Sequence, residues 1–213
     1  MARILIYGDS ISWGNFDNIS GGWAHMLKNA FLKTGRSNQV YDLSISGKIS
    51  DSLPERVKFE TKYRLHAEYK DVNTIIIALG INDAKLIADK KPAVSIRQFE
   101  KNITDSIKVC RKYADNIVII GLTPVDEGKS RPIPWDEDKY HYNKLTAKYD
   151  QKLKQIARRE SVHFINILSV WKKLDYKKLL HDGVHPNTKG HKELFKKINS
   201  YLISHKLLPN STR

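Results

Sequence analysis

Three residue types that together carry out acyl transfer stand near the two ends of the chain. Ser10 follows the first apolar run, in the segment Gly8-Asp9-Ser10, and Asp182 lies three residues before His185. A serine hydroxyl is a poor nucleophile until a neutral imidazole takes its proton, and a carboxylate must hold that imidazole in the correct tautomer. Ser10, His185 and Asp182 can therefore serve as nucleophile, base and orienting carboxylate if the fold brings them together.

A tetrahedral intermediate formed at Ser10 would carry an oxyanion that needs preorganised hydrogen-bond donors. Two further segments offer donors, namely residues 46–47 (Ser-Gly) and 80–83 (Gly-Ile-Asn-Asp). The candidates are the backbone N–H groups of Ser10 and Gly47 and the side-chain amide of Asn82. Asp9 and Asp83 stand beside them. Since short carboxylates often bond local backbone N–H groups, we expect each to fix the turn that aims its neighbour.

The elements that must position these residues alternate along the chain. Short, mostly apolar segments rich in β-branched residues predict strands at residues 4–7, 40–45, 74–79, 117–121 and 162–165. Apolar residues at helical spacing predict helices at about 22–35, about 53–68, 96–113, about 140–159 and 189–204. Strands without strict alternation are typical of a parallel sheet that is covered on both faces. We therefore expect an α/β fold with right-handed crossovers.

Ligands of such sheets bind beyond the carboxyl ends of the strands. Ser10, Gly47 and Asn82 follow the first three predicted strands, so we expect them to gather at one edge of the sheet. No linker rich in proline or glycine divides the 213 residues. Residues 1–213 are therefore expected to form a single domain.

The chain is basic, and this charge suggests a competing function. Its 37 Lys and Arg against 23 Asp and Glu give a net charge of +14, with most of the excess in residues 101–213. A non-catalytic polyanion-binding protein is therefore an alternative. However, the lysines at 189, 192, 196 and 197 segregate from the apolar residues of the same predicted helix, as a solvated face does. No zinc-finger or RNA-binding signature is present, so we expect no specific nucleic-acid partner.

Features of compartment and anchoring point to a cytoplasmic protein. No apolar stretch approaches the 18 residues of a membrane span, and the first apolar run is too short for a signal peptide. The one cysteine, Cys110, cannot form an internal disulfide and lies on an apolar helical stripe. We expect a buried thiol, no membrane span and a cytoplasmic location.

Four segments together resemble the SGNH (GDSL-type) hydrolase family, whose sequence blocks centre on Ser, Gly, Asn and His. Ser10, Gly47, Asn82 and His185 match these blocks in order, and the resemblance spans residues 4–191. It implies a flavodoxin-like three-layer α/β/α sandwich with strand order 2-1-3-4-5. It also implies hydrolysis of esters or thioesters without a metal or other cofactor, by a triad that Asp182 completes. Ser10, Gly47 and Asn82 would then bind the oxyanion.

The substrate is less strongly indicated than the reaction. The loop after the fourth predicted strand, with Trp135, Tyr140 and Tyr142 among charged residues, could border a pocket. Trp13 is expected either to contact an acyl group or to pack in the core. Substrates of the resembled family include acetylated sugars, short-chain esters, lysophospholipids and acyl thioesters. We favour a small polar ester, with a lysophospholipase or acyl thioesterase as the nearest alternatives.

The other histidines show no spacing typical of metal ligands. We expect no metal site, and we interpret these residues as surface or packing histidines. They are His25, His66, His141, His163, His181, His191 and His205.

Overall fold

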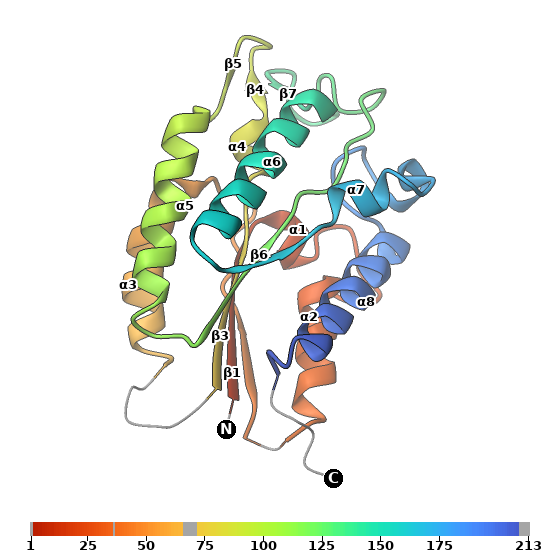
Figure 1. The fold of residues 1–213 in the computed structure, drawn as a ribbon. Helices are drawn as coiled ribbons and strands as arrows, with labels where there is room; N and C mark the ends of the chain where they lie inside the picture. The colour runs from red at the N-terminus through yellow and green to blue at the C-terminus, as the bar shows by residue number, and fades with distance from the viewer. Residues whose placement is uncertain (1, 36, 66–71, 209–213) are drawn as a thin grey trace.

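A computed structural model describes residues 2–35, 37–65 and 72–208, so His66 lies outside the described residues. Its central sheet is parallel, in the order β2-β1-β3-β6-β8 (Figure 1). This is the predicted order 2-1-3-4-5 when only the five parallel strands are numbered. The strands are β1 (Ala2–Gly8), β2 (Gln39–Asp42), β3 (Val72–Ala78), β6 (Asn116–Ile120) and β8 (His163–Ile165).

The second strand is shorter than predicted. It ends at Asp42, whose Oδ1 accepts the N–H of Ser44 at 3.0 Å. The chain still runs beside β1 for three more residues, because the Leu43 N–H donates to Ile6 O and the Ile45 N–H to Gly8 O. It turns away from the sheet at residues 46–47, where the Lys48 N–H donates to Ile45 O.

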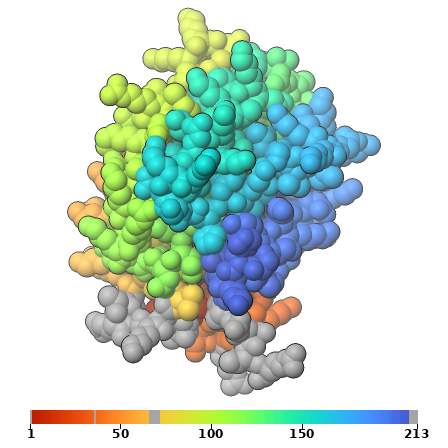
Figure 2. Space-filling model, viewed as in Figure 1, coloured from red at the N-terminus to blue at the C-terminus, as the bar shows by residue number. Residues whose placement is uncertain are grey.

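Five long helices flank the sheet and confirm the predicted ones, four of them to within about three residues at either end. The helix predicted at about 53–68 ends at Lys62, and residues 66–68 of that prediction lie outside the described residues. Figure 1 shows two of them, α2 and α8, on one side of the sheet and three on the other, and in Figure 2 α5, α6 and α8 cover the face turned to the viewer. The α5 helix begins where the sequence indicates, since Ser95 Oγ accepts the N–H of Gln98. The bounds are α2 (Gly22–Leu32), α3 (Leu53–Lys62), α5 (Ile96–Cys110), α6 (Asn143–Arg159) and α8 (Thr188–Ser204).

Alternate residues of the central strands supply two separate cores. Leu5 of β1 and Ile77 of β3 pack with α3, α5 and α6 on one face, whereas Ile6 and Ile76 pack with α2 and α8 on the other. This two-sided burial confirms the expectation drawn from the apolar runs. Cys110 lies fully buried in the first core, as predicted, and its burial raises the pKa of the thiol to about 12.

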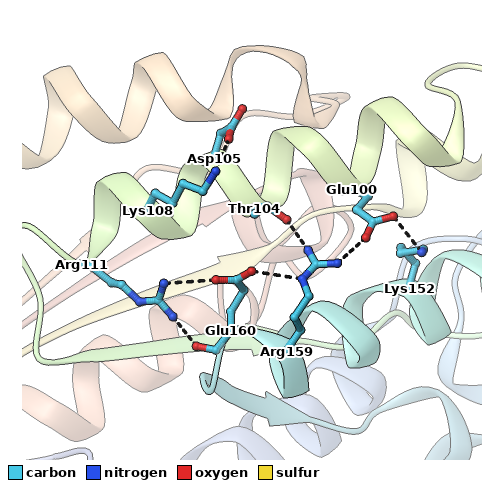
Figure 3. A network of polar contacts seen from close by, with 8 residues as sticks. All are labelled: Glu100, Thr104, Asp105, Lys108, Arg111, Lys152, Arg159 and Glu160. Atoms are coloured by element: carbon cyan, nitrogen blue, oxygen red, sulfur yellow. Dashed lines mark hydrogen bonds and ion pairs between the residues drawn. The ribbon is translucent and has the colours of Figure 1, made fainter.

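Charged side chains join α5 to α6 at the surface (Figure 3). Glu100 accepts hydrogen bonds from Lys152 at 2.8 Å and from Arg159 at 2.5 Å, and these bonds hold the pKa of its carboxyl below the ordinary value. Glu160 pairs with both Arg111 and Arg159. Some of the basic side chains of residues 101–213 are thus paired with carboxylates.

A second, smaller sheet lies beyond the carboxyl ends of β3 and β6, at the top of Figure 1. Its antiparallel strands are β4 (Leu86–Ile87), β5 (Lys91–Pro92) and β7 (Lys139–Tyr140), in the order β5-β4-β7. Strands of two residues carry no periodicity, so this sheet could not be predicted from the sequence. Three short helices were also missed, α1 (Ser10–Trp13), α4 (Ile81–Ala84) and α7 (Leu168–Trp171). No helix within the described ranges combines the length and apolar composition that a membrane crossing requires.

The turn from β1 into α1 depends on Asp9. Its Oδ1 accepts the N–H of Ile11 at 3.0 Å, which is the local role that the sequence predicted. Asp9 is only 2% exposed. Because burial disfavours the charged carboxylate, the pKa of Asp9 rises to about 7 in spite of that hydrogen bond.

The segment that carries Asp182 and His185 is fastened to the start of α8. The N–H of Asn187 donates to Leu179 O at 2.9 Å, and Asn187 Oδ1 caps α8 by accepting the N–H of Gly190 at 3.0 Å. Gly190 lies so close to this segment that a Cβ there would stand 2.3 Å from Leu179 O. The absence of a side chain at 190 lets the loop seat against the helix.

We expect Gly190→Ala to destabilise the protein by about 1–3 kcal/mol, although alanine is the better helix former by about 1 kcal/mol. The added methyl must displace backbone at Leu179. Urea unfolding of this variant beside Lys189→Ala, at an exposed neighbouring position, measures the effect. If Gly190→Ala were as stable as the wild type or more stable, the close contact between position 190 and Leu179 O would not require glycine.

We also expect the stability difference between Asp9→Asn and the wild type to change with pH. An unfolded Asp9 ionises near pH 3.9, roughly, whereas the folded one keeps its proton until about pH 7. Raising the pH through this window therefore favours the unfolded wild type, by about 1.4 kcal/mol for each unit of pKa shift. Asp9→Asn has no such ionisation, so its free energy of unfolding should rise relative to that of the wild type between pH 4 and 7. Urea unfolding at several pH values checks this; a constant difference would contradict it.

Candidate active site

The structure brings the three proposed triad residues together at the carboxyl edge of the sheet. Ser10 is the first residue of α1, directly beyond β1, and its Oγ lies 2.7 Å from His185 Nε2. His185 Nδ1 lies 2.7 Å from Asp182 Oδ2. One imidazole therefore bridges a hydroxyl and a carboxylate, an arrangement that can move a proton from the hydroxyl.

Asp182 is held by its own loop as well as by the imidazole. Its Oδ1 accepts the backbone N–H groups of Val184 at 2.9 Å and His185 at 2.8 Å. Burial alone would raise the pKa of the carboxyl, but His185 and these two N–H groups outweigh it and hold the pKa below its ordinary value. Gly183 adopts a φ of +97°, the left-handed region in which glycine is favoured, so the loop can fold back on its carboxylate.

Asn82 presents an amide nitrogen without a partner. Its Oδ1 accepts from Lys85 Nζ at 3.3 Å, whereas its Nδ2 is buried and has no acceptor among the residues that the structure describes. Buried donors are almost always hydrogen-bonded in folded proteins, so an orphan at a pocket wall indicates an acceptor supplied by a ligand. Asn82 lines the same pocket as Ser10.

Gly47 also lines this pocket. Its φ is +74°, and no atom lies within 4 Å of where a Cβ would be. The backbone conformation, rather than crowding, is therefore what favours glycine here. Asn15 Nδ2 donates to Ser46 Oγ at 3.1 Å, which ties residues 46–47 to the chain that follows α1.

The role expected for Asp83 was wrong. Instead of bonding its own turn, Asp83 Oδ1 accepts from the backbone N–H of Ser50 at 2.9 Å and from Ser50 Oγ at 2.6 Å. Asp83 thus joins the segment after residues 46–47 to α4, which carries Asn82. Its burial raises the pKa of the carboxyl to about 6. The partner lies 33 residues away, a distance that local turn chemistry could not predict.

A cavity of about 250 Å³ opens over these groups. Trp135 borders it, as expected of its loop, with its ring centroid 5.5 Å from that of His185, and Phe16 stands at 5.1 Å. Tyr140 and Tyr142 are not among its lining residues. The lining residues are Ser10, Asn15, Phe16, Ser46, Gly47, Ile81, Asn82, Lys85, Ile133, Trp135, Lys139, His141, Val184 and His185.

Trp13 does neither of the things expected of it. Its side chain is 58% exposed and borders a separate surface groove beside β2. The α1 helix is only one turn long and is capped by Gly14. Trp13 and Ser10 thus lie at its two ends and border different hollows, the groove beside β2 and the pocket over the triad.

Lys85, Lys139 and His141 are pocket residues that the sequence analysis did not identify. His141 is buried as a packing histidine would be, yet it lines the pocket, and burial together with Lys85 and His185 lowers its pKa to about 3. Only the pairing of the small sheet reveals these positions. Within the described residues, no three histidine, cysteine or carboxylate side chains gather as a metal site would require.

Comparisons with known proteins agree with this architecture. Among solved structures, a lipase/acylhydrolase from Enterococcus faecalis superposes with a TM-score of 0.74 at 17% identity, over 96% of this chain and 97% of that one. A catalytic mutant of Axe2, an acetylxylan esterase from Geobacillus stearothermophilus, gives 0.71 at 17% identity over 93% of both chains. TesA gives 0.69 at 19% identity, over 94% and 97%. At these identities the likeness supports the fold.

Sequence comparisons extend this result. A curated relative from Bacillus subtilis (strain 168), the uncharacterized lipoprotein YqeF, is 26% identical over 130 residues, which are 60% of this chain. The match spans 51%, about half, of that relative's length. The model of the GDSL-like lipase/acylhydrolase family matches residues 6–193, most of the chain. This protein therefore belongs to the GDSL-like lipase/acylhydrolase family.

Proposed function

We propose that this protein is a serine esterase that hydrolyses small carboxylic esters through an acyl-enzyme intermediate. The hydrogen-bonded series from Ser10 through His185 to Asp182, facing a pocket with an unpartnered Asn82 amide, carries the proposal. Membership of a family of lipases and acylhydrolases supports the same reaction class. A single domain over residues 1–213 and a cytoplasmic location are parts of this proposal.

In the acylation step, Ser10 Oγ attacks the ester carbonyl carbon while His185 Nε2 takes the hydroxyl proton. Asp182 stabilises the imidazolium through its contact with Nδ1. The carbonyl oxygen becomes an oxyanion, which accepts hydrogen bonds from Asn82 Nδ2 and from the backbone N–H groups of Ser10 and Gly47. Collapse of this intermediate expels the alcohol, which takes the proton from His185.

In the deacylation step, water enters in place of the alcohol. His185 takes a proton from this water as it attacks the acyl carbon, and a second tetrahedral intermediate uses the same oxyanion donors. Its collapse returns the proton to Ser10 Oγ and releases the carboxylic acid. The overall reaction is ester plus water to acid plus alcohol, with the enzyme regenerated.

The pocket favours a small, polar ester over the alternatives. Its volume of about 250 Å³ suits a short acyl group, and its lining mixes lysine, asparagine and serine with aromatic rings. A lysophospholipase or a long-chain acyl thioesterase needs an extended apolar channel instead. The polyanion-binding alternative does not account for the series from Ser10 through His185 to Asp182, although Arg111, Lys152 and Arg159 form only part of the basic surface and pair with carboxylates.

We expect Ser10→Ala to lower kcat for 4-nitrophenyl acetate by roughly 10⁴-fold or more, because no other hydroxyl of the described residues forms a hydrogen bond with His185 Nε2. Circular dichroism should show an intact fold. Ser12→Ala, a change of the same chemistry two residues along α1, is the matched control and should keep activity within a few-fold. Turnover retained by Ser10→Ala would refute the nucleophile.

We expect Asn82→Ala to lower kcat by roughly 10²- to 10³-fold with little change in substrate binding, since the lost donor acts mainly in the transition state. Asn82→Asp should be at least as damaging, because it keeps the shape but sets a negative charge against the oxyanion. Steady-state kinetics of both folded variants measure the effect. An aspartate variant with near-normal kcat would place the oxyanion donors elsewhere.

A further inference from the structure

The small sheet sets two lysines and a histidine along one wall of the pocket. Antiparallel pairing of β4 with β7 aligns Ile87 with Lys139. Continued by two residues, this register puts Lys85 opposite His141, and Lys139 lies on the same face of its strand as His141 because side chains alternate. All three side chains line the pocket that holds Ser10.

Lys85 brings to this wall a positive charge that has no ion-pair partner among the described carboxylates. It is partly buried, its Nζ donates to Asn82 Oδ1 at 3.3 Å, and no carboxylate of the described residues lies within ion-pair distance of it. Burial and the neighbouring Lys139 ammonium hold the pKa of Lys85 below its ordinary value. Asp136, Asp83 and Asp9 act on the Lys85 pKa in the opposite direction, but none of the three forms an ion pair with this ammonium.

The neighbouring groups leave this charge in place. Lys139 forms an ion pair with Asp136, so these two charges offset each other. His141 adds no charge near neutral pH because its pKa is about 3. Asp83 is the carboxylate of α4, but it is fully buried and bonded to Ser50. The wall therefore has a net positive charge that a substrate can meet.

We propose that Lys85, assisted by Lys139, recognises an anionic group, a carboxylate or a phosphate, that the ester substrate carries a few bonds from its carbonyl. This inference rests on the proposed esterase function and specifies its substrate class. The partly buried ammonium of Lys85 would donate a charge-assisted hydrogen bond to such a group, stronger than one to a neutral acceptor. Lys85 Nζ contacts Oδ1 of the same Asn82 amide whose Nδ2 is the proposed oxyanion donor. The anionic group and the ester carbonyl of one substrate can therefore bind side by side.

A purely structural role for Lys85 predicts different behaviour. If Lys85 only orients the Asn82 amide, its loss should slow the hydrolysis of charged and neutral esters by the same factor. If it binds an anion, the loss should fall mainly on charged esters. The ratio of kcat/KM for an anionic ester to that for its neutral analogue therefore separates the two roles.

The experiment compares matched ester pairs with the full chain. Mono-4-nitrophenyl succinate and 4-nitrophenyl methyl succinate vary the charge in the acyl part, and 4-acetoxybenzoate and its methyl ester vary it in the alcohol part. A third pair replaces the succinate carboxylate by a phosphonate and its dimethyl ester, which distinguishes the two kinds of anion. Each rate is divided by the rate of uncatalysed hydrolysis of the same ester.

Three variants should lower, raise or leave unchanged the ratio of kcat/KM for the anionic ester to that for the neutral one. Lys85→Gln keeps an N–H donor but loses the charge, and should lower the anionic-to-neutral ratio by about 10- to 100-fold in at least one pair. Asp136→Asn frees the Lys139 ammonium and should raise that ratio. Lys90→Gln, at an exposed lysine of the same hairpin, is the control for the overall charge of the protein and should leave the ratio unchanged.

The outcomes distinguish a failure of the proposed anion site from a failure of the proposed esterase function. A wild-type enzyme that hydrolyses the neutral esters through Ser10 but shows an unchanged ratio in Lys85→Gln overturns the anion site and leaves the esterase proposal standing. An equal loss for charged and neutral esters overturns it in favour of the orienting role. If no ester is hydrolysed at all, the esterase proposal fails, and the anion site fails with it.

Discussion

The hydrogen bond between Ser10 Oγ and His185 Nε2 is the contact on which the account of this protein depends, and it joins residues 175 positions apart in the chain. It exists because a parallel sheet collects the ends of its strands at one edge, and because the segment before α8 is seated there by Asn187 and Gly190. Each partner is then fixed locally: Asp9 shapes the turn before Ser10, and Asp182 orients His185. The sheet brings the site residues to one edge, and short polar contacts orient their side chains.

Much of this arrangement could be predicted from the sequence. Apolar runs and helical spacing predicted the five parallel strands and the five long helices, because burial on both faces leaves a strong signal. The strand order came from the resemblance to the SGNH (GDSL-type) hydrolases. Ser10, Gly47 and Asn82 could be identified because each follows a predicted strand. The wall formed by Lys85, Lys139 and His141 could not, since two-residue strands have no pattern. The contact from Asp83 to Ser50 and the outward position of Trp13 likewise depend on tertiary packing.

The pKa values of the titratable groups at the site depend on how deeply each group is buried and on which charges and hydrogen-bond donors lie next to it. Asp182 stays ionised because an imidazole and two N–H groups face it, whereas burial raises the pKa of Asp9 to about 7 and of Asp83 to about 6. Among the basic groups, burial lowers the pKa of His141 to about 3 and keeps it neutral. Lys85 lines the pocket and forms no ion pair with a carboxylate in the part of the chain that the structure describes. The site therefore combines one firmly charged carboxylate beside the base with a cation beside the proposed oxyanion donor.

The central claim is that Ser10 is a nucleophile activated by His185, and covalent labelling with a fluorophosphonate tests it most directly. Such a reagent bonds to an activated serine and spares ordinary hydroxyls. The account predicts that mass spectrometry of the intact wild-type protein will show one added probe, that peptide mapping will place it on Ser10, and that Ser10→Ala will remain unmodified. A wild-type protein left unlabelled, or equal labelling of the alanine variant, would contradict the claim.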